Sequence, residues 1–223
     1  MNARLFVLSL CLSLTGISRA ENGFLVGGGP NISTTNSGGD EYSPRWGWGG
    51  GFGYEHNLVG LLYVVPGAAL ETRGEIFRSP SDDSKATLKL LYLQVPLHLM
   101  VRIPIGEGAI EAFFGASIGY NIAASIERVD GNGDSHSEDI KDDVNFFECG
   151  LESGFGFEIP VGPGSLFVRP TLYRGLTHPL DFSPGTKLNN VQLKVGFRFP
   201  LLAPASAAAP YAPPPPPPPA FEP

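Results

Sequence analysis

Charged side chains recur at every second position of several apolar segments, so the residues that could do chemistry would share one strand face. In the segment 146–159, for example, Glu148, Glu152 and Glu158 alternate with phenylalanine and aliphatic residues. A period of two places successive side chains on opposite faces of a β-strand. The same alternation elsewhere predicts an inner face that carries the following charged residues: Glu71, Arg73, His98, Arg102, Glu111, Glu148, Glu152, Glu158, Arg169, Lys194 and Arg198.

This charged face has two interpretations, which are a charged pore or hidden active site, and a polar plug. A closed barrel of about eight strands is just wide enough for side chains to fill its interior. Isolated buried charges are too costly, so the side chains must pair with one another or be hydrated. We therefore favour a plug over a conducting pore.

Hydrolytic chemistry would need a nucleophile beside a base, most often a serine beside a histidine. Of the four histidines, His56, His98, His136 and His178, only His136 has adjacent serines, in Ser135-His136-Ser137. Adjacency in sequence is weak support for a catalytic pair. We therefore predict that the protein is not an enzyme and has no catalytic residue.

The run Asp130-Gly131-Asn132-Gly133-Asp134 matches the start of an EF-hand calcium loop. The match fails afterwards, because Ser135 stands where the loop needs glycine and Lys141 where it needs glutamate. Weak cation binding by Asp139, Asp142 and Asp143 stays open, but a solvated acidic loop over 127–145 is the simpler interpretation. No metal site and no cofactor are predicted.

The strand that best defines the architecture is the segment 110–126, IEAFFGASIGYNIAASI. Every second residue from Ile110 to Ile126, including Ala124, is apolar, and all but one of the residues between them are small or polar. A transmembrane helix is the first alternative, since Gly115 and Gly119 form a GxxxG pair. Glu111 leaves too short an apolar run for the roughly 18–20 residues that such a helix needs.

The second alternative is a soluble barrel with the apolar face turned inward. A water-facing strand usually carries lysine, glutamate and threonine, whereas the other face of 110–126 is rich in glycine, serine and alanine. Such small residues fit a crowded barrel interior. The segment is therefore typical of the wall of a membrane barrel.

The whole chain predicts an all-β fold, an eight-stranded antiparallel up-and-down transmembrane barrel. The expected strands are 23–30, 45–55, 58–73, 88–104, 110–126, 146–159, 165–176 and 189–199. Short connections near His56-Asn57, Gly106 and Gly162 alternate with long ones at 31–44, 74–86, 127–145 and 177–188. Outer-membrane barrels show this alternation, with short turns on the periplasmic side. Aromatic residues at strand ends predict interfacial belts made of Trp46, Trp48, Tyr54, Tyr120, Phe197 and Phe199.

Both ends of the chain differ in composition from the strands. Arg4, the apolar run 5–14 and Ser18-Arg19-Ala20 are typical of a secretory signal peptide, so we expect residues 1–20 to be removed. The expected mature chain would carry 13 basic and 22 acidic residues, about −9, which argues against nucleic acid as a partner. Its single cysteine, Cys149, could form no internal disulfide. Residues 201–223, with the run 213–219, predict an extended Pro-rich periplasmic tail after a barrel domain over 21–200.

Several of these segments resemble the PorT-like outer-membrane β-barrel proteins. Residues 91–97, LYLQVPL, are similar to that family's Tyr-Leu-x-[Ile/Val]-Pro-Leu segment, and residues 114–120, FGASIGY, to its Ala-Gly-x-x-x-Gly-Tyr stretch. Residues 150–158 and 173–176 resemble its later strands. The resemblance implies a small barrel of the OmpA and OmpX kind. The tail looks like the linker that follows the barrel in OmpA-like proteins, but we expect no peptidoglycan-binding domain after it.

Pattern and resemblance together predict a non-enzymatic protein of a Gram-negative outer membrane, which anchors and displays loops for adhesion or interaction. A narrow passive porin-like channel is the alternative, and a lipid-modifying enzyme is a third. Expected partners are outer-membrane lipids, the barrel assembly machinery and an external ligand of the loops. We expect no nucleic acid, and a monomer.

Overall fold

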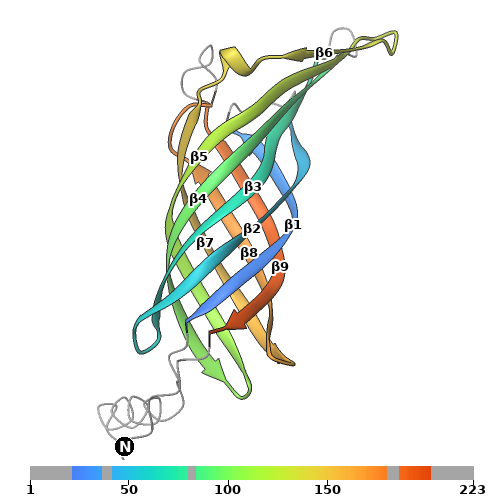
Figure 1. Cartoon of the computed structure of the whole chain (residues 1–223). Helices are drawn as coiled ribbons and strands as arrows, with labels where there is room; N and C mark the ends of the chain where they lie inside the picture. The colour runs from blue at the N-terminus through green and yellow to red at the C-terminus, as the bar shows by residue number, and fades with distance from the viewer. Residues whose placement is uncertain (1–21, 37–41, 80–83, 180–185, 202–223) are drawn as a thin grey trace, which may run out of the picture.

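Eight antiparallel strands close into a tilted barrel in the computed structural model, which describes residues 22–36, 42–79, 84–179 and 186–201 (Figure 1). The strands follow the order β4-β3-β2-β1-β9-β8-β7-β5, and β4 also pairs with β5, which closes the ring. A ninth strand, β6, pairs only with the far end of β5. The bounds are β1 (Gly23–Thr35), β2 (Tyr42–Val59), β3 (Leu62–Arg78), β4 (Lys85–Ile105), β5 (Gly108–Val129), β6 (Ser135–Asp139), the 3₁₀ helix η1 (Lys141–Asp143), β7 (Phe147–Val161), β8 (Gly164–Gly175) and β9 (Leu188–Pro200).

The predicted fold class, an eight-stranded antiparallel barrel, is confirmed. The predicted signal peptide and all of the predicted tail except Leu201 lie outside the described residues. Among the described residues, no helical segment has the length and hydrophobicity that crossing a bilayer as a helix requires.

Short turns join the strands at the end of the barrel where β1 begins and β9 ends, and longer connections join them at the other end (Figure 1). Each short turn contains a glycine with positive φ, at Gly60 (55°), Gly106 (60°) and Gly162 (59°), a conformation that other residues rarely adopt. The prediction of a turn at His56-Asn57 is wrong, because β2 continues to Val59. The long connections are shorter than predicted, since β1 continues to Thr35 and β2 begins at Tyr42.

The outer surface of the barrel is apolar. Val95, Phe114 and Ile118 lie in three places on this surface and are 57%, 57% and 53% exposed. The charged residues of the alternating positions lie inside, where all are buried except His98 and Lys194, which are partly buried. An apolar surface of this extent needs a lipid environment. The soluble-barrel alternative is therefore wrong, and so is the helical interpretation of 110–126, which lies in β5.

A β-bulge reverses the alternation in the upper part of β5. Tyr92 of β4 pairs with Asn121 of β5, and the residue before it, Leu91, pairs with Ala123. Ile122 is therefore an extra residue on β5, which forms the bulge. Beyond the bulge Ala123 is exposed, whereas Ala124 is buried and Ile126 packs against the same interior cluster. The prediction that Ala124 and Ile126 share the outer face of Ile110 is wrong for this reason.

Glycines on the inner face make room for aromatic rings from neighbouring strands. A Cβ atom on Gly150 would lie 2.3 Å from the ring of Tyr173, and one on Gly196 would lie 2.4 Å from the ring of Phe167. Only glycine permits such close approach. The many glycines of the chain are thus part of the way in which the narrow interior is packed.

Candidate functional site

Two regions carry the polar residues that could act, the barrel interior and the sheet that extends beyond it. The first group in the interior lies near the short turns, and we name it the turn-side ion cluster. It contains three carboxylates and three guanidinium groups, which are formally neutral together: Glu55, Glu111, Glu158, Arg102, Arg169 and Arg198.

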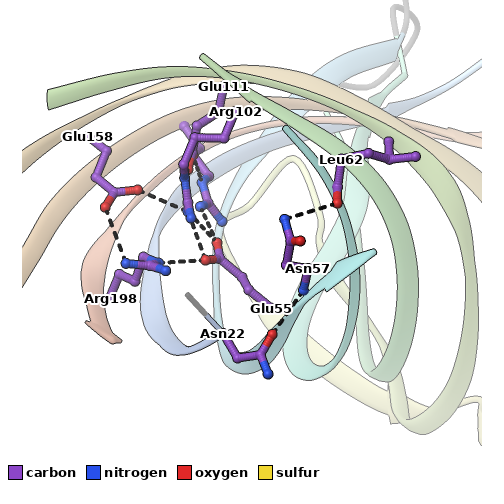
Figure 2. A network of polar contacts seen from close by, with 9 residues as sticks. Asn22, Glu55, Asn57, Leu62, Arg102, Glu111, Glu158 and Arg198 are labelled. Atoms are coloured by element: carbon purple, nitrogen blue, oxygen red, sulfur yellow. Dashed lines mark hydrogen bonds and ion pairs between the residues drawn. The ribbon is translucent and has the colours of Figure 1, made fainter. Parts of the chain in front are cut away.

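Glu55 lies at the centre of the turn-side ion cluster and is fully buried (Figure 2). Its Oε2 accepts from Arg102 Nη2 at 2.7 Å and from Arg198 Nε at 2.6 Å, and its Oε1 accepts from Arg169 Nη2 at 3.0 Å. Glu111 accepts hydrogen bonds from Arg102 Nε at 2.9 Å and from Arg169 Nε at 2.6 Å. Charge-assisted bonds of this kind compensate for much of the desolvation of the six groups.

A second group lies further towards the long connections, and we name it the loop-side ion cluster. Its members are Glu71, Arg73, His98, Glu148, Glu152 and Lys194. The buried guanidinium of Arg73 lies 2.9 Å from Glu71 and 3.3 Å from Glu148, and its carbon is 3.5 Å from the centre of the Tyr173 ring. His98 Nε2 lies 3.1 Å from Glu152.

Apolar layers accompany the ion clusters inside the barrel. Leu25, Tyr63, Val65, Met100, Phe113 and Phe167 form one layer, and Arg102 lies over the ring of Tyr63 with 4.9 Å to its centre. A cavity of about 90 Å³ adjoins this layer and reaches Glu71, His98, Arg169 and Lys194. The interior is therefore largely filled by side chains, as expected for eight strands.

A second apolar layer closes the end of the barrel that bears the long connections. Its residues are Leu88, Leu90, Tyr92, Ala124, Ile140, Val144 and Leu188. Ile140 and Val144 flank η1 and are 5% and 2% exposed, so the acidic connection folds back over the barrel. The prediction of a solvated loop over 127–145 is wrong for this part.

All of the charged residues that alternation assigned to the inner face lie in the two ion clusters. Sequence reasoning missed Glu55, which is the centre of one of them. The expected strand ended at Glu55, although this residue continues the inward series of Gly51 and Gly53 by one further step of two. Extending the alternation by that step would have found it.

The aromatic residues proposed as belts lie on the outer surface in two groups. Trp46, Trp48 and Tyr120 are exposed towards the end with long connections. Phe199 is exposed and Tyr54 and Phe197 are partly exposed towards the end with short turns. Two groups separated along the barrel are what an interfacial role requires, and that role stays a proposal.

The outer face of β4 shows where the apolar surface ends. It is apolar from Ile105 to Leu91, which is roughly 46 Å along the strand and roughly 33 Å along the barrel axis at a tilt of about 45°. That length covers the hydrocarbon core of a bilayer, about 30 Å thick. From Lys89 onward the outer residues of β4 are polar, so the strands extend beyond the membrane.

We name this extension the projecting sheet, and it consists of residues 75–78 of β3, 85–89 of β4, 123–129 of β5 and all of β6 (Figure 1). Ion pairs cross its strands. Lys89 donates a hydrogen bond to Glu127, which with the ammonium charge holds the pKa of that carboxyl below its usual value. Arg128 Nη1 lies 2.9 Å from Glu138 Oε2.

The serines beside His136 do not form a catalytic pair with it by adjacency. All three residues lie in β6, where neighbouring side chains point to opposite faces. Asp130 accepts hydrogen bonds from the backbone nitrogens of Asn132 and Asp134, so its carboxylate stabilises a turn. Within the described ranges, no three histidine, cysteine, aspartate or glutamate side chains are grouped as metal ligands.

Comparisons with known proteins give distant similarities to solved structures and one match to a family model. No curated protein matches the chain. One similar solved structure is that of Ail, the attachment invasion locus protein of Yersinia pestis, in complex with the heparin analogue sucrose octasulfate. Its sequence is 19% identical, the match covers 80% of this chain and 99% of that one, and the TM-score is 0.42. Neisserial surface protein A is 14% identical (80% and 97% covered, TM-score 0.47), and OprG of Pseudomonas aeruginosa is 13% identical (81% and 96% covered, TM-score 0.37).

A family model gives the assignment that these distant structures cannot. The model described as "Outer membrane protein beta-barrel domain" matches residues 19–181, which is more than half of the chain. The match includes the barrel strands β1 to β5, β7 and β8, whose outward faces are apolar within the barrel, and it agrees with a location in the outer membrane of a Gram-negative bacterium. The chain belongs to the outer membrane protein β-barrel domain family.

Proposed function

We propose that this protein is a non-enzymatic outer-membrane anchor that displays the projecting sheet for adhesion or for contact with macromolecules outside the cell. The observation that carries the proposal is the continuation of β3, β4 and β5 past the apolar surface, ending in a β6 whose five residues are all exposed. Strands that served only to cross the membrane would have no need of this length.

The filled interior supports anchoring over conduction. Two ion clusters and two apolar layers occupy the lumen, and Ile140 and Val144 cover one end of it. The narrow passive channel is thus the weaker function for this chain. We also propose a finer family assignment, to the PorT-like barrels. This assignment is compatible with either role.

The test is adhesion of cells that express the protein to a matrix-coated surface. Replacing residues 130–139 with a Gly-Ser segment of equal length should reduce adhesion at least about fivefold, because it removes β6 but leaves the barrel strands unchanged. The control replaces residues 80–83, between β3 and β4, with a Gly-Ser segment of equal length. Heat-modifiable migration on a gel verifies that each barrel is folded.

Planar-bilayer recordings on the same preparations test the channel. Wild-type protein should give no reproducible single-channel steps. Stable steps together with unchanged adhesion of the 130–139 variant would overturn the proposal in favour of the channel.

A further inference from the structure

In the part of the chain that the structure describes, no strand lies beside the outer edge of β6. In the sheet order β6 is the last strand, and within the described part of the chain it pairs with β5 alone. Figure 1 shows β6 at the end of the molecule furthest from the short turns. An exposed strand edge is a template for pairing with another extended chain.

Two hydrogen bonds determine which residues of β6 face outward along this edge. Ile140 N donates to Ala124 O at 3.1 Å, and Asp130 N donates to Asp134 O at 3.1 Å. In an antiparallel pair the hydrogen-bonded residues alternate, so the even-numbered residues of β6 bond to β5. The amide and carbonyl groups of Ser135, Ser137 and Asp139 therefore point away from β5.

The surface around this edge has excess negative charge. Arg128 pairs with Glu138, and Lys89 pairs with Glu127. No ion pair is found in the described residues for the remaining carboxylates of the connection, and Lys141 is the only other cation among residues 127–143. These carboxylates belong to Asp130, Asp134, Asp139, Asp142 and Asp143.

The charge decides between the chains that could pair with the edge. A second copy of β6 would bring two acidic segments to the same edge, and repulsion between like charges would oppose this pairing in either orientation. A segment with lysine or arginine at alternate positions would instead meet the aspartates while its backbone bonds to Ser135, Ser137 and Asp139. Added strands of this kind obtain affinity from backbone hydrogen bonds and specificity from side chains.

We propose that the free edge of β6 binds a basic, extended polypeptide segment of a partner protein by adding it as a further antiparallel or parallel strand. The proposal rests on the proposed display function, because the edge meets an external partner only if the projecting sheet lies outside the cell. It adds to that function the binding element and the chemistry of the partner.

The probe is a fluorescent ten-residue peptide in which lysine alternates with threonine and valine. Fluorescence anisotropy measures its binding to the purified full chain in neutral detergent micelles. The matched control peptide has the same sequence and charge but N-methyl groups on alternate amides, which removes the donors that strand pairing needs. The unmodified peptide should bind at least about tenfold more tightly than the methylated one.

Variants of the protein, in place of variants of the peptide, test the same edge. Ser137→Pro removes an amide hydrogen that points away from β5, so it should leave the pairing with β5 in place and weaken peptide binding at least about tenfold. Ser137→Ala keeps that amide and should bind like wild type. Should Ser137→Pro fail to fold on the heat-modifiability gel, the methylated peptide still tests the proposal with wild-type protein.

Equal binding of the two peptides would overturn the proposal, since it would mean attraction by charge without strand pairing. Absence of binding to wild type would overturn it as well. Peptide binding is measured on purified protein and adhesion on cells. Absence of peptide binding with normal adhesion contradicts only the proposal for the edge. Peptide binding without adhesion contradicts only the display function.

Discussion

The strands β3, β4 and β5 pass through two environments, the barrel and the projecting sheet. In the barrel their outer faces are apolar and their inner faces meet buried charges such as Arg73 and Glu111. In the projecting sheet the same strands carry exposed ion pairs, such as the one between Lys89 and Glu127. Stability and recognition are therefore separated along the strands, and equal substitutions should have unequal effects in the two regions.

The largest effect should come from removing the closure of the barrel. Truncation before Gln192 deletes most of β9 and leaves β1 without its partner, so we expect no folded barrel and degradation in the cell. Truncation after Leu201 should retain the heat-modifiable band, because β9 ends at Pro200 and Leu201 N still bonds to Asn22 O. Loss of the band in the second case would show that residues 202–223 belong to the fold.

The next effect concerns buried charge. Glu55→Gln leaves three arginines facing only two carboxylates, and we expect a loss of about 3–5 kcal/mol in the free energy of unfolding. The matched change in the projecting sheet is Glu138→Gln, in an exposed pair, with an expected loss of about 0–1 kcal/mol. Urea unfolding in lipid vesicles measures both. Equal losses would contradict the separation of the two regions.

The lipid-facing surface gives a slightly smaller effect. Ile118→Arg places a charge on the outer face of β5 and should cost about 2–4 kcal/mol near the bilayer midplane. Thr87→Arg, on the outer face of β4 in the projecting sheet, lies beside Glu127 and should leave folding unchanged. Gly119→Ala, which points inward at the ring of Tyr92, should cost less than Ile118→Arg. Refolding of Ile118→Arg as readily as wild type would mean that the outer face is misassigned.

The change with the largest expected effect on adhesion should have only a small effect on stability. The Gly-Ser replacement of 130–139 removes only exposed residues, so the free energy of unfolding measured in urea should fall by no more than about 1 kcal/mol. A larger loss would show that β6 supports the barrel.

Alternation along single strands was enough to predict the fold and the inner faces, because a period of two is a property of each strand alone. It failed at Ile122, because a bulge depends on the register between β4 and β5. It failed at Ile140 and Val144, because burial in a connection depends on what lies beneath it. Glu55 was missed although it lay at the end of the expected strand, because the inward series was followed only as far as Gly53. The free edge of β6 could not be predicted, since it depends on which strand has no neighbour.

We infer that the barrel anchors the chain while the projecting sheet lies outside the cell. The most direct test adds a protease specific for glutamate to intact cells. It should cut after Glu138, in the exposed β6, and leave Glu107 intact, because that residue lies in the short turn between β4 and β5 at the opposite end. Cleavage after Glu107 with Glu138 protected would invert the orientation and contradict the account.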